Sequence, residues 1–222
     1  NLGAVRDKVL LYYFYACLVN GELETAERLA QALEKSLGSD HPMEQGMLAC
    51  FKSWQALLND NMPAAITNAD ESIDLCKKIG VPNFQMHALI SKALGLNKMR
   101  QFHSAMSCIR EIRENVNGTK SPLFDFTLLL IEADATFGLT DLDKANEKLA
   151  EAFDIGNRFD QMGSAQWIAP IMSRLCERAL SAGIQPEYVS RLIRHRKLVA
   201  PSHEMEAWPW PLKVATLGRF EL

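Results

Sequence analysis

The sequence has no long uncharged apolar run. A membrane-spanning helix needs roughly 18 such residues, and the nearest approach, residues 9–19, is shorter and contains three tyrosines. A secretion signal is also lacking, and the chain begins with Asn1 rather than Met. We therefore expect a cytoplasmic segment of a longer gene product, with no membrane partner.

Paired cysteines are absent as well. The five cysteines contain no C-x-x-C pair, and each lies in a helical pattern among apolar neighbours: Cys17, Cys50, Cys76, Cys108 and Cys176. We predict buried free thiols, because cysteine packs as a small hydrophobic side chain. The odd count favours a reducing compartment. The histidines have no ligand spacing with the cysteines, so no metal site is predicted.

The sequence lacks an excess of one charge and lacks catalytic motifs. A net charge of -3 gives no general attraction for nucleic acid, so DNA is expected as a partner only through a domain outside this segment. No G-x-x-x-x-G-K-[ST] phosphate loop and no serine in a nucleophile elbow occur. We therefore predict that the segment is not an enzyme and holds no cofactor.

The sequence does contain an internal repeat. Alanines at 26, 65, 105 and 145 are spaced by 39, 40 and 40 residues, and each follows a large apolar residue by three positions. Small residues recur at 53, 93 and 133, as two closely crossing helices require. Self-similarity at a fixed period of this length is the signature of a solenoid of helix pairs.

Each repeat unit is predicted to form a helix A, a tight turn and a helix B. Glycines 21, 38, 80, 118 and 183 mark helix ends, and prolines 63, 122 and 186 mark first turns. The A helices are expected near 4–19, 43–59, 83–99, 122–138 and 165–182. The B helices are expected near 23–37, 62–79, 102–116, 141–157 and 186–197.

The repeat resembles the tetratricopeptide repeat in its small and large positions, including Gly21, Leu23 and Ala26. The usual period of that family is about 34 residues, whereas the period here is about 40. Long-period arrays of this kind are similar to the sensor domain of the maltose-regulon activator and its large bacterial ATPase-containing relatives. Over residues 1–199 the resemblance implies an all-α, right-handed superhelix of about five antiparallel helix pairs.

The C-terminal residues have a different composition. Residues 200–211 are predicted to form an extended linker, because prolines alternate with tryptophans and exclude a helix. Residues 212–222 read as a strand, and Leu217, Gly218, Phe220, Glu221 and Leu222 resemble the LLGxFEL-like first strand of the winged-helix domain in bacterial activators of the antibiotic-regulatory-protein type. The resemblance implies that a DNA-binding domain follows.

Together the two resemblances imply a ligand- or protein-binding sensor of a multidomain bacterial transcriptional regulator. The sensor would relay effector binding to flanking ATPase and DNA-binding modules, so ATP is expected only in an upstream domain. The alternative is a free-standing tetratricopeptide scaffold that binds a peptide or a partner protein. Homo-oligomers are a further expectation, because an exposed end repeat can stack on another copy.

Helix A residues line the concave face of tetratricopeptide superhelices, which gives candidates for a ligand or partner groove. They are Tyr12, Tyr15, Met47, Phe51, Trp54, Ile90, Leu94, Ile131 and Asp134. Aromatic side chains offer a large contact area to a ligand or a partner helix. Packing between repeats is the alternative for each of these residues.

A basic cluster ends the last predicted helix and consists of Arg191, Arg194, His195, Arg196 and Lys197. It can bind phosphate or the acidic face of a neighbouring domain. The alternative is that these cations complement the dipole at a helix C-terminus and face water.

Overall fold

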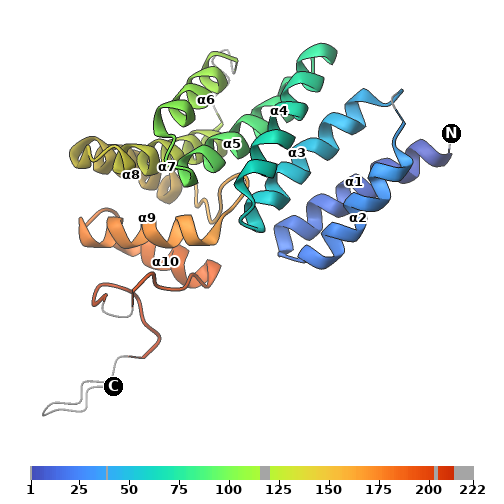
Figure 1. Cartoon of the computed structure of the whole chain (residues 1–222). Coiled ribbons are helices and arrows are strands. Elements are labelled where there is room, and N and C mark those ends of the chain that lie inside the picture. Colours follow the sequence, from blue (N-terminus) through green and yellow to red (C-terminus); the bar gives the residue numbers. More distant parts are fainter. Residues whose placement is uncertain (1, 39, 116–120, 203–204, 213–222) are drawn as a thin grey trace, which may run out of the picture.

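The computed structural model describes residues 2–38, 40–115, 121–202 and 205–212, and contains ten helices and no strand within them (Figure 1). The helices are α1 (Leu2–Asn20), α2 (Leu23–Ser36), α3 (Pro42–Leu58), α4 (Met62–Ile79), α5 (Pro82–Lys98), α6 (Phe102–Asn115), α7 (Pro122–Gly138), α8 (Leu142–Arg158), α9 (Ala169–Ser181) and α10 (Pro186–Arg196). The all-α prediction is confirmed. The predicted helix ends agree with the observed ones within two residues, with one exception. Helix α9 begins at Ala169, four residues later than predicted.

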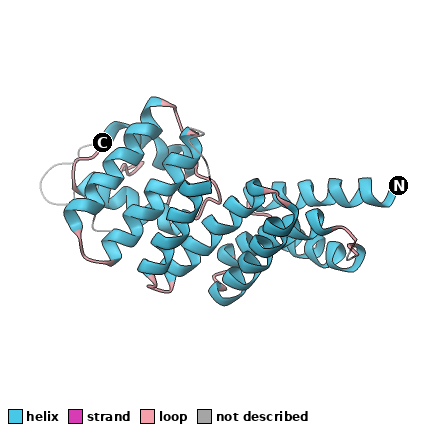
Figure 2. Ribbon diagram, turned by 90° about the horizontal axis from the view of Figure 1, so that it is seen from above, coloured by secondary structure: helices cyan, strands magenta, loops and turns pink. Residues whose placement is uncertain are grey.

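The helices form two layers. The odd-numbered helices α1, α3, α5 and α7 each contact the next odd-numbered helix. The even-numbered helices α2, α4, α6 and α8 each contact the odd-numbered helices before and after them. Figures 1 and 2 show the pairs following one another along an elongated array, with α9 and α10 turned beneath α7 and α8. Consecutive helix pairs thus bury their apolar faces against their neighbours.

The turns between paired helices repeat one backbone geometry. A left-handed residue occurs at Gly21, Asp60, Arg100, Thr140 and Gly183, with φ between 58° and 76°. The next amide then donates to a carbonyl five residues earlier, over 2.8 to 3.3 Å. This bond satisfies one of the carbonyls that a helix C-terminus leaves unpaired. Three of the five turns use residues other than glycine, so glycine marked only the first and the last, and the repeat spacing located the other three.

The other predicted helix-ending glycines have different outcomes. Gly80 is left-handed, with a φ of 70°. Gly38 follows the extended C-cap residue of α2 and is not left-handed. Gly118 lies outside the described residues.

The recurring small residues lie at the helix crossings. All four repeat alanines and the small residues at 53, 93 and 133 are fully buried. The Ser53 hydroxyl donates to the Ala65 carbonyl at 2.7 Å, which joins α3 to α4 where the helices approach closely. Close approach at these positions explains why no larger side chain is present.

The fifth pair departs from the regular spacing. Residues 159–168 form a non-helical segment between α8 and α9. Two hydrogen bonds attach this segment to earlier odd-numbered helices: Gln166 Nε2 donates to the His87 carbonyl at 2.7 Å, and the Ala165 amide donates to Thr127 Oγ1 at 3.0 Å. The segment therefore lies against the side of the odd-numbered helices that the even-numbered helices do not cover.

Residues in the predicted linker also contact the helical core. Trp208 is buried, with 3% of its surface exposed, and Trp210 Nε1 donates to the Met205 carbonyl at 2.8 Å. The strand predicted from residue 212 lies, beyond Leu212, outside the described residues. Within the described residues, none of the helices combines the length and hydropathy needed to cross a bilayer, and all five cysteines are free and buried, as predicted.

Candidate functional site

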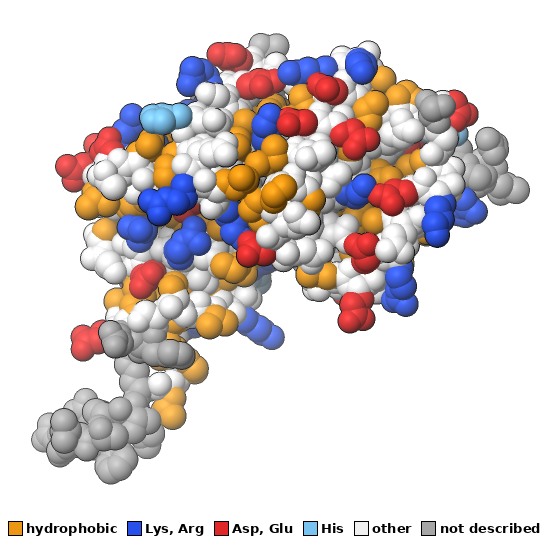
Figure 3. All heavy atoms as spheres, in the orientation of Figure 1, with side chains coloured by type: hydrophobic (Ala, Val, Ile, Leu, Met, Phe, Trp, Pro, Cys, Tyr) orange, Lys and Arg blue, Asp and Glu red, His pale blue; other side chains and the backbone are white. Residues whose placement is uncertain are grey.

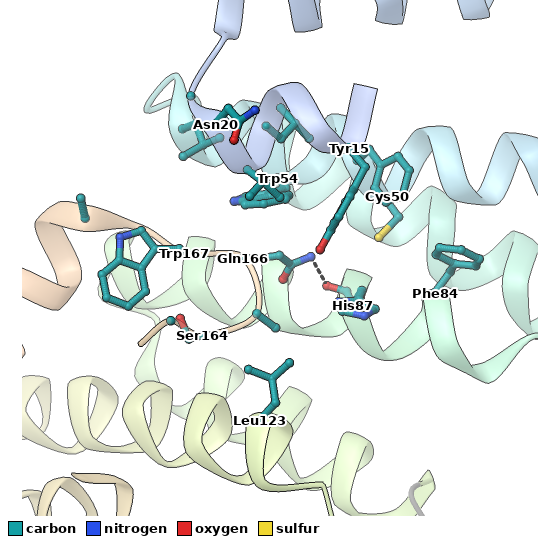
Figure 4. Close-up of a pocket in the computed structure, with 18 of the residues that line it drawn as sticks. Tyr15, Asn20, Cys50, Trp54, Phe84, His87, Leu123, Ser164, Gln166 and Trp167 are labelled. Atoms are coloured by element: carbon teal, nitrogen blue, oxygen red, sulfur yellow. Dashed lines mark hydrogen bonds between the residues drawn. The ribbon is translucent and has the colours of Figure 1, made fainter. Parts of the chain in front are cut away.

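A cavity of about 590 Å³ lies between α1, α3, α5 and α7 on one side and the 161–168 segment on the other. Figure 4 shows the segment facing these helices across the cavity. Volumes of roughly 300–1,000 Å³ are typical of sites for small organic ligands. Most of the side chains that line the cavity are apolar or aromatic, so shape and ring contacts dominate what it can bind.

Aromatic side chains from three helices form one wall. The Tyr15 ring lies 5.5 Å from Phe51 and 5.9 Å from Trp54, measured between centroids. Phe84 of α5 extends the group, 6.1 Å from Phe51 and nearly perpendicular to it. These distances are those of favourable edge and offset ring contacts. Tyr15 is 44% exposed, so part of its ring is available to a ligand.

The opposite wall is held in place by Gln166. Its side-chain amide donates to the His87 carbonyl, as drawn in Figure 4. Its backbone has a φ of +53°, a left-handed conformation that is uncommon for residues other than glycine. The hydrogen bond to His87 fixes this part of the segment against α5.

Two polar atoms of residues that line the cavity are buried and have no hydrogen-bond partner among the described residues. They are the Trp54 indole Nε1, a donor, and the Gln166 carbonyl Oε1, an acceptor. Both residues are more than nine-tenths buried, and both line the cavity. An unpaired buried polar group costs about 1–3 kcal/mol, so these two atoms lower the stability of the folded chain.

Arg196 of α10 supplies positive charge at the cavity. Its guanidinium carbon lies 4.3 Å above the centre of the Trp167 ring, a cation–π contact. Burial lowers the pKa of Arg196, yet a guanidinium remains protonated at neutral pH. Arg196 has no carboxylate within ion-pair distance among the described residues.

Two further titratable side chains at the cavity, His87 and Cys50, are uncharged. Burial lowers the pKa of His87 and raises the pKa of the Cys50 thiol, so the imidazole is neutral and the thiol stays protonated at pH 7. Cys50 is therefore a poor nucleophile. Among the described residues no group of three His, Cys, Asp or Glu side chains is arranged to hold a metal ion.

Four of the predicted groove residues line the cavity together: Tyr12, Tyr15, Phe51 and Trp54. The others lie outside it. Met47, Ile90, Leu94 and Ile131 are buried, and Leu94 and Ile131 border a void of about 20 Å³ beneath residues 164–168. The chain itself covers the inner surface there. The binding roles of all these residues remain predictions.

Asp134 and the predicted basic cluster lie in several environments. Asp134 Oδ1 accepts from Arg174 at 3.1 Å, away from the cavity. Arg191 pairs with Asp160 at 3.6 Å, whereas Arg194 and Lys197 are exposed. Of the cluster, Arg196 alone lines the described cavity, so the cluster does not form a single site. Acidic and basic side chains are interspersed over the face drawn in Figure 3.

Sequence reasoning missed the residues contributed by α5 and the 161–168 segment. Phe84, His87, Gln166 and Trp167 all line the cavity. For the last two, the available signal was the stretch from Gly163 to Pro170, where the helical pattern is interrupted. No pattern indicated that this stretch contacts His87, 79 residues earlier than Gln166.

No protein-family model matches the chain, and no curated protein matches it with significant sequence similarity.

Proposed function

We propose that this chain is the small-molecule-binding sensor of a multidomain bacterial transcriptional regulator, and that its effector binds in the cavity between the odd-numbered helices and the 161–168 segment. The observation that carries the proposal is an aromatic cavity of about 590 Å³, with Tyr15, Phe51 and Trp54 on one wall and the 161–168 segment opposite. Tyr15 is 44% exposed, so a ligand in the cavity can contact its ring.

A small molecule fits this cavity better than an extended peptide does. Peptide-binding helical arrays need an open inner face along several repeats. Here the 161–168 segment covers part of that face and contacts α5 and α7. A compact ligand fits beside the segment, whereas a long peptide would have to displace it.

The regulatory part of the proposal rests on the two resemblances. The helix pairs support a tetratricopeptide-like, right-handed superhelix. The proposal also includes a cytoplasmic location and the absence of enzymatic activity in this segment. Residues 208–222 support a following winged-helix domain. The 161–168 segment leads directly into α9, which contacts α10. A ligand that binds one arrangement of this segment more tightly would shift the last helix pair and the modules beyond it.

A scaffold that binds another protein is the second candidate. It is favoured by the exposed apolar face of α1, where Val5, Val9 and Tyr12 are each more than 60% exposed and follow helical spacing. A reading frame that continues past Leu222 into a winged-helix domain would favour the regulator over this scaffold.

Binding of the neutral fluorescent probe N-phenyl-1-naphthylamine tests the cavity. Its emission rises in apolar surroundings, and we expect saturable binding to the wild-type chain. Tyr15→Ala should weaken binding about fivefold, because an aromatic contact contributes about 0.5–1.5 kcal/mol. Tyr13→Ala is the matched control, since Tyr13 lies on the same helix, is 49% exposed and does not line the cavity. Equal affinity in both variants would place the probe elsewhere and contradict the proposal.

A further inference from the structure

We propose that the ligand of this cavity is an anionic aromatic compound, a ring system that carries a carboxylate, sulfonate or phosphate held by Arg196. The inference rests on the proposed function and specifies the chemistry of its effector. Three observations on the cavity support it: its charge, the geometry of Arg196, and the aromatic rings of the remaining wall.

The charge of the cavity is positive and uncompensated. Arg196 is the one formally charged side chain at neutral pH among the described residues that line it, and no aspartate or glutamate is among them. Among the other arginines of α8, α9 and α10, three have a carboxylate partner, namely Arg158, Arg174 and Arg191, whereas Arg178 and Arg194 are exposed and have none among the described residues. An anion would supply at this cavity the counter-charge that those three arginines already have.

The geometry of Arg196 leaves its hydrogen-bonding edge available. One face of the guanidinium covers the Trp167 ring, which fixes the plane of the group. None of its N–H groups takes part in a hydrogen bond or ion pair with another described residue. A planar fork held in this way matches the two oxygens of a carboxylate, sulfonate or phosphate.

The rest of the cavity fits the neutral part of such a ligand. The rings of Tyr15, Phe51 and Trp54 offer faces and edges for an aromatic system. Trp54, Gln166 and Trp167, labelled in Figure 4, line the same cavity as Arg196. One compact molecule in this cavity can therefore use both the ring contacts and the anion contact.

A matched pair of probes separates charge from ring contacts. 8-Anilinonaphthalene-1-sulfonate has the ring system of N-phenyl-1-naphthylamine plus one sulfonate. We expect the wild-type chain to bind the sulfonate probe more tightly than the neutral one. Arg196→Met should weaken binding of the sulfonate probe about tenfold, since hydrogen bonds to charged groups are among the strong ones and this site is partly exposed. The affinity for the neutral probe should change by less than about twofold.

Arg178→Met is the control. Arg178 also stacks on an aromatic ring, 4.2 Å from the Phe137 centroid, but it lies outside the cavity. This substitution should leave both affinities unchanged. The unfolding midpoint of each variant shows whether an effect on binding is separate from an effect on folding.

The outcomes distinguish the two proposals. If the neutral probe binds in a Tyr15-dependent way but as tightly as the sulfonate, and Arg196→Met affects neither, the anionic ligand class is wrong and the binding cavity stands. If neither probe binds in a Tyr15-dependent way, the proposed function fails together with the inference.

Discussion

Trp54 combines a buried ring with an unpaired donor, and the two features make opposite contributions to stability. The ring is 4% exposed and contacts Tyr15. The indole Nε1 has no partner among the described residues. Packing alone does not require tryptophan at this position, because phenylalanine offers an aromatic ring without the polar atom.

Trp54→Phe should therefore leave the free energy of unfolding within about 1 kcal/mol of the wild type, since relief of the unpaired donor offsets the smaller ring. Trp54→Ala should lose about 3–5 kcal/mol, as large core truncations do. Urea unfolding followed by circular dichroism measures both. A loss in Trp54→Phe well above about 1 kcal/mol would show that the smaller ring dominates and that relief of the unpaired donor contributes little.

His87 should make the stability of the chain depend on pH. Burial lowers the pKa of its imidazole, whereas an unfolded histidine titrates near about 6.5. The folded state thus binds fewer protons, so its stabilising contribution is complete above about pH 6.5 and is lost as the pH falls toward the lowered pKa.

We expect His87→Leu to show a smaller loss of unfolding free energy between pH 7 and pH 5 than the wild type. The leucine keeps an apolar contact with Phe124, whose ring lies 5.4 Å from the imidazole. His103→Gln is the control variant, because His103 is exposed. If the unfolding free energy of His87→Leu changed with pH as much as that of the wild type, other groups would account for the acid sensitivity.

At the scale of helices, two glycines test how closely the elements pack. Gly156 of α8 faces α10 and α7: a Cβ built there would lie 2.3 Å from Tyr188 Oη and 2.9 Å from Phe126 Cε2. Gly95 of α5 has more room, and its nearest neighbour would be Ile66 Cγ1 at 3.4 Å. Both lie within helices, where alanine is intrinsically favoured over glycine by about 1 kcal/mol.

Gly156→Ala should lower the free energy of unfolding by about 1–3 kcal/mol, because displacing two buried rings outweighs the gain in helix propensity. Gly95→Ala should be neutral or stabilising by up to about 1 kcal/mol. Chemical denaturation measures the difference between the two. Stabilisation by both substitutions would mean that α8 and α10 can separate at little cost.

Among the helices, some could be predicted from local sequence signals and one could not. Helices such as α4 and α8 have local signals, with Asn61 and Asp141 side chains accepting from backbone amides in the first turn. Ser121 holds the N-cap position of α7, but its side chain makes no capping bond. The late start of α9 was not predictable, because the 161–168 segment is stabilised by contacts with distant helices rather than by its own neighbours.

At the scale of the whole molecule, the array extends beyond its last helix. Trp208 is buried and belongs to the same apolar cluster as α9 and α10. Trp208→Ala should therefore lower the unfolding free energy by about 3–5 kcal/mol. Val199→Ala, at a position that is 76% exposed, should change it by less than about 0.5 kcal/mol.

Thermal unfolding of the two variants checks this expectation. A Trp208→Ala chain as stable as the wild type would mean that residues 205–210 contribute nothing to the folded unit. Those residues would then act only as a covalent connection between α10 and the C-terminal end of the chain.

The sequence alone determined the helix pairs, their period of about 40 residues and the aromatic side chains of α1 and α3. These features depend on helical periodicity, turn residues and small residues at crossings, all of which act between positions close in sequence. Only the tertiary structure decided which of those aromatics form a cavity, and that Gln166, Trp167 and Arg196 complete it. Those residues meet α1, α3 and α5 through contacts between distant parts of the chain, which no local pattern encodes.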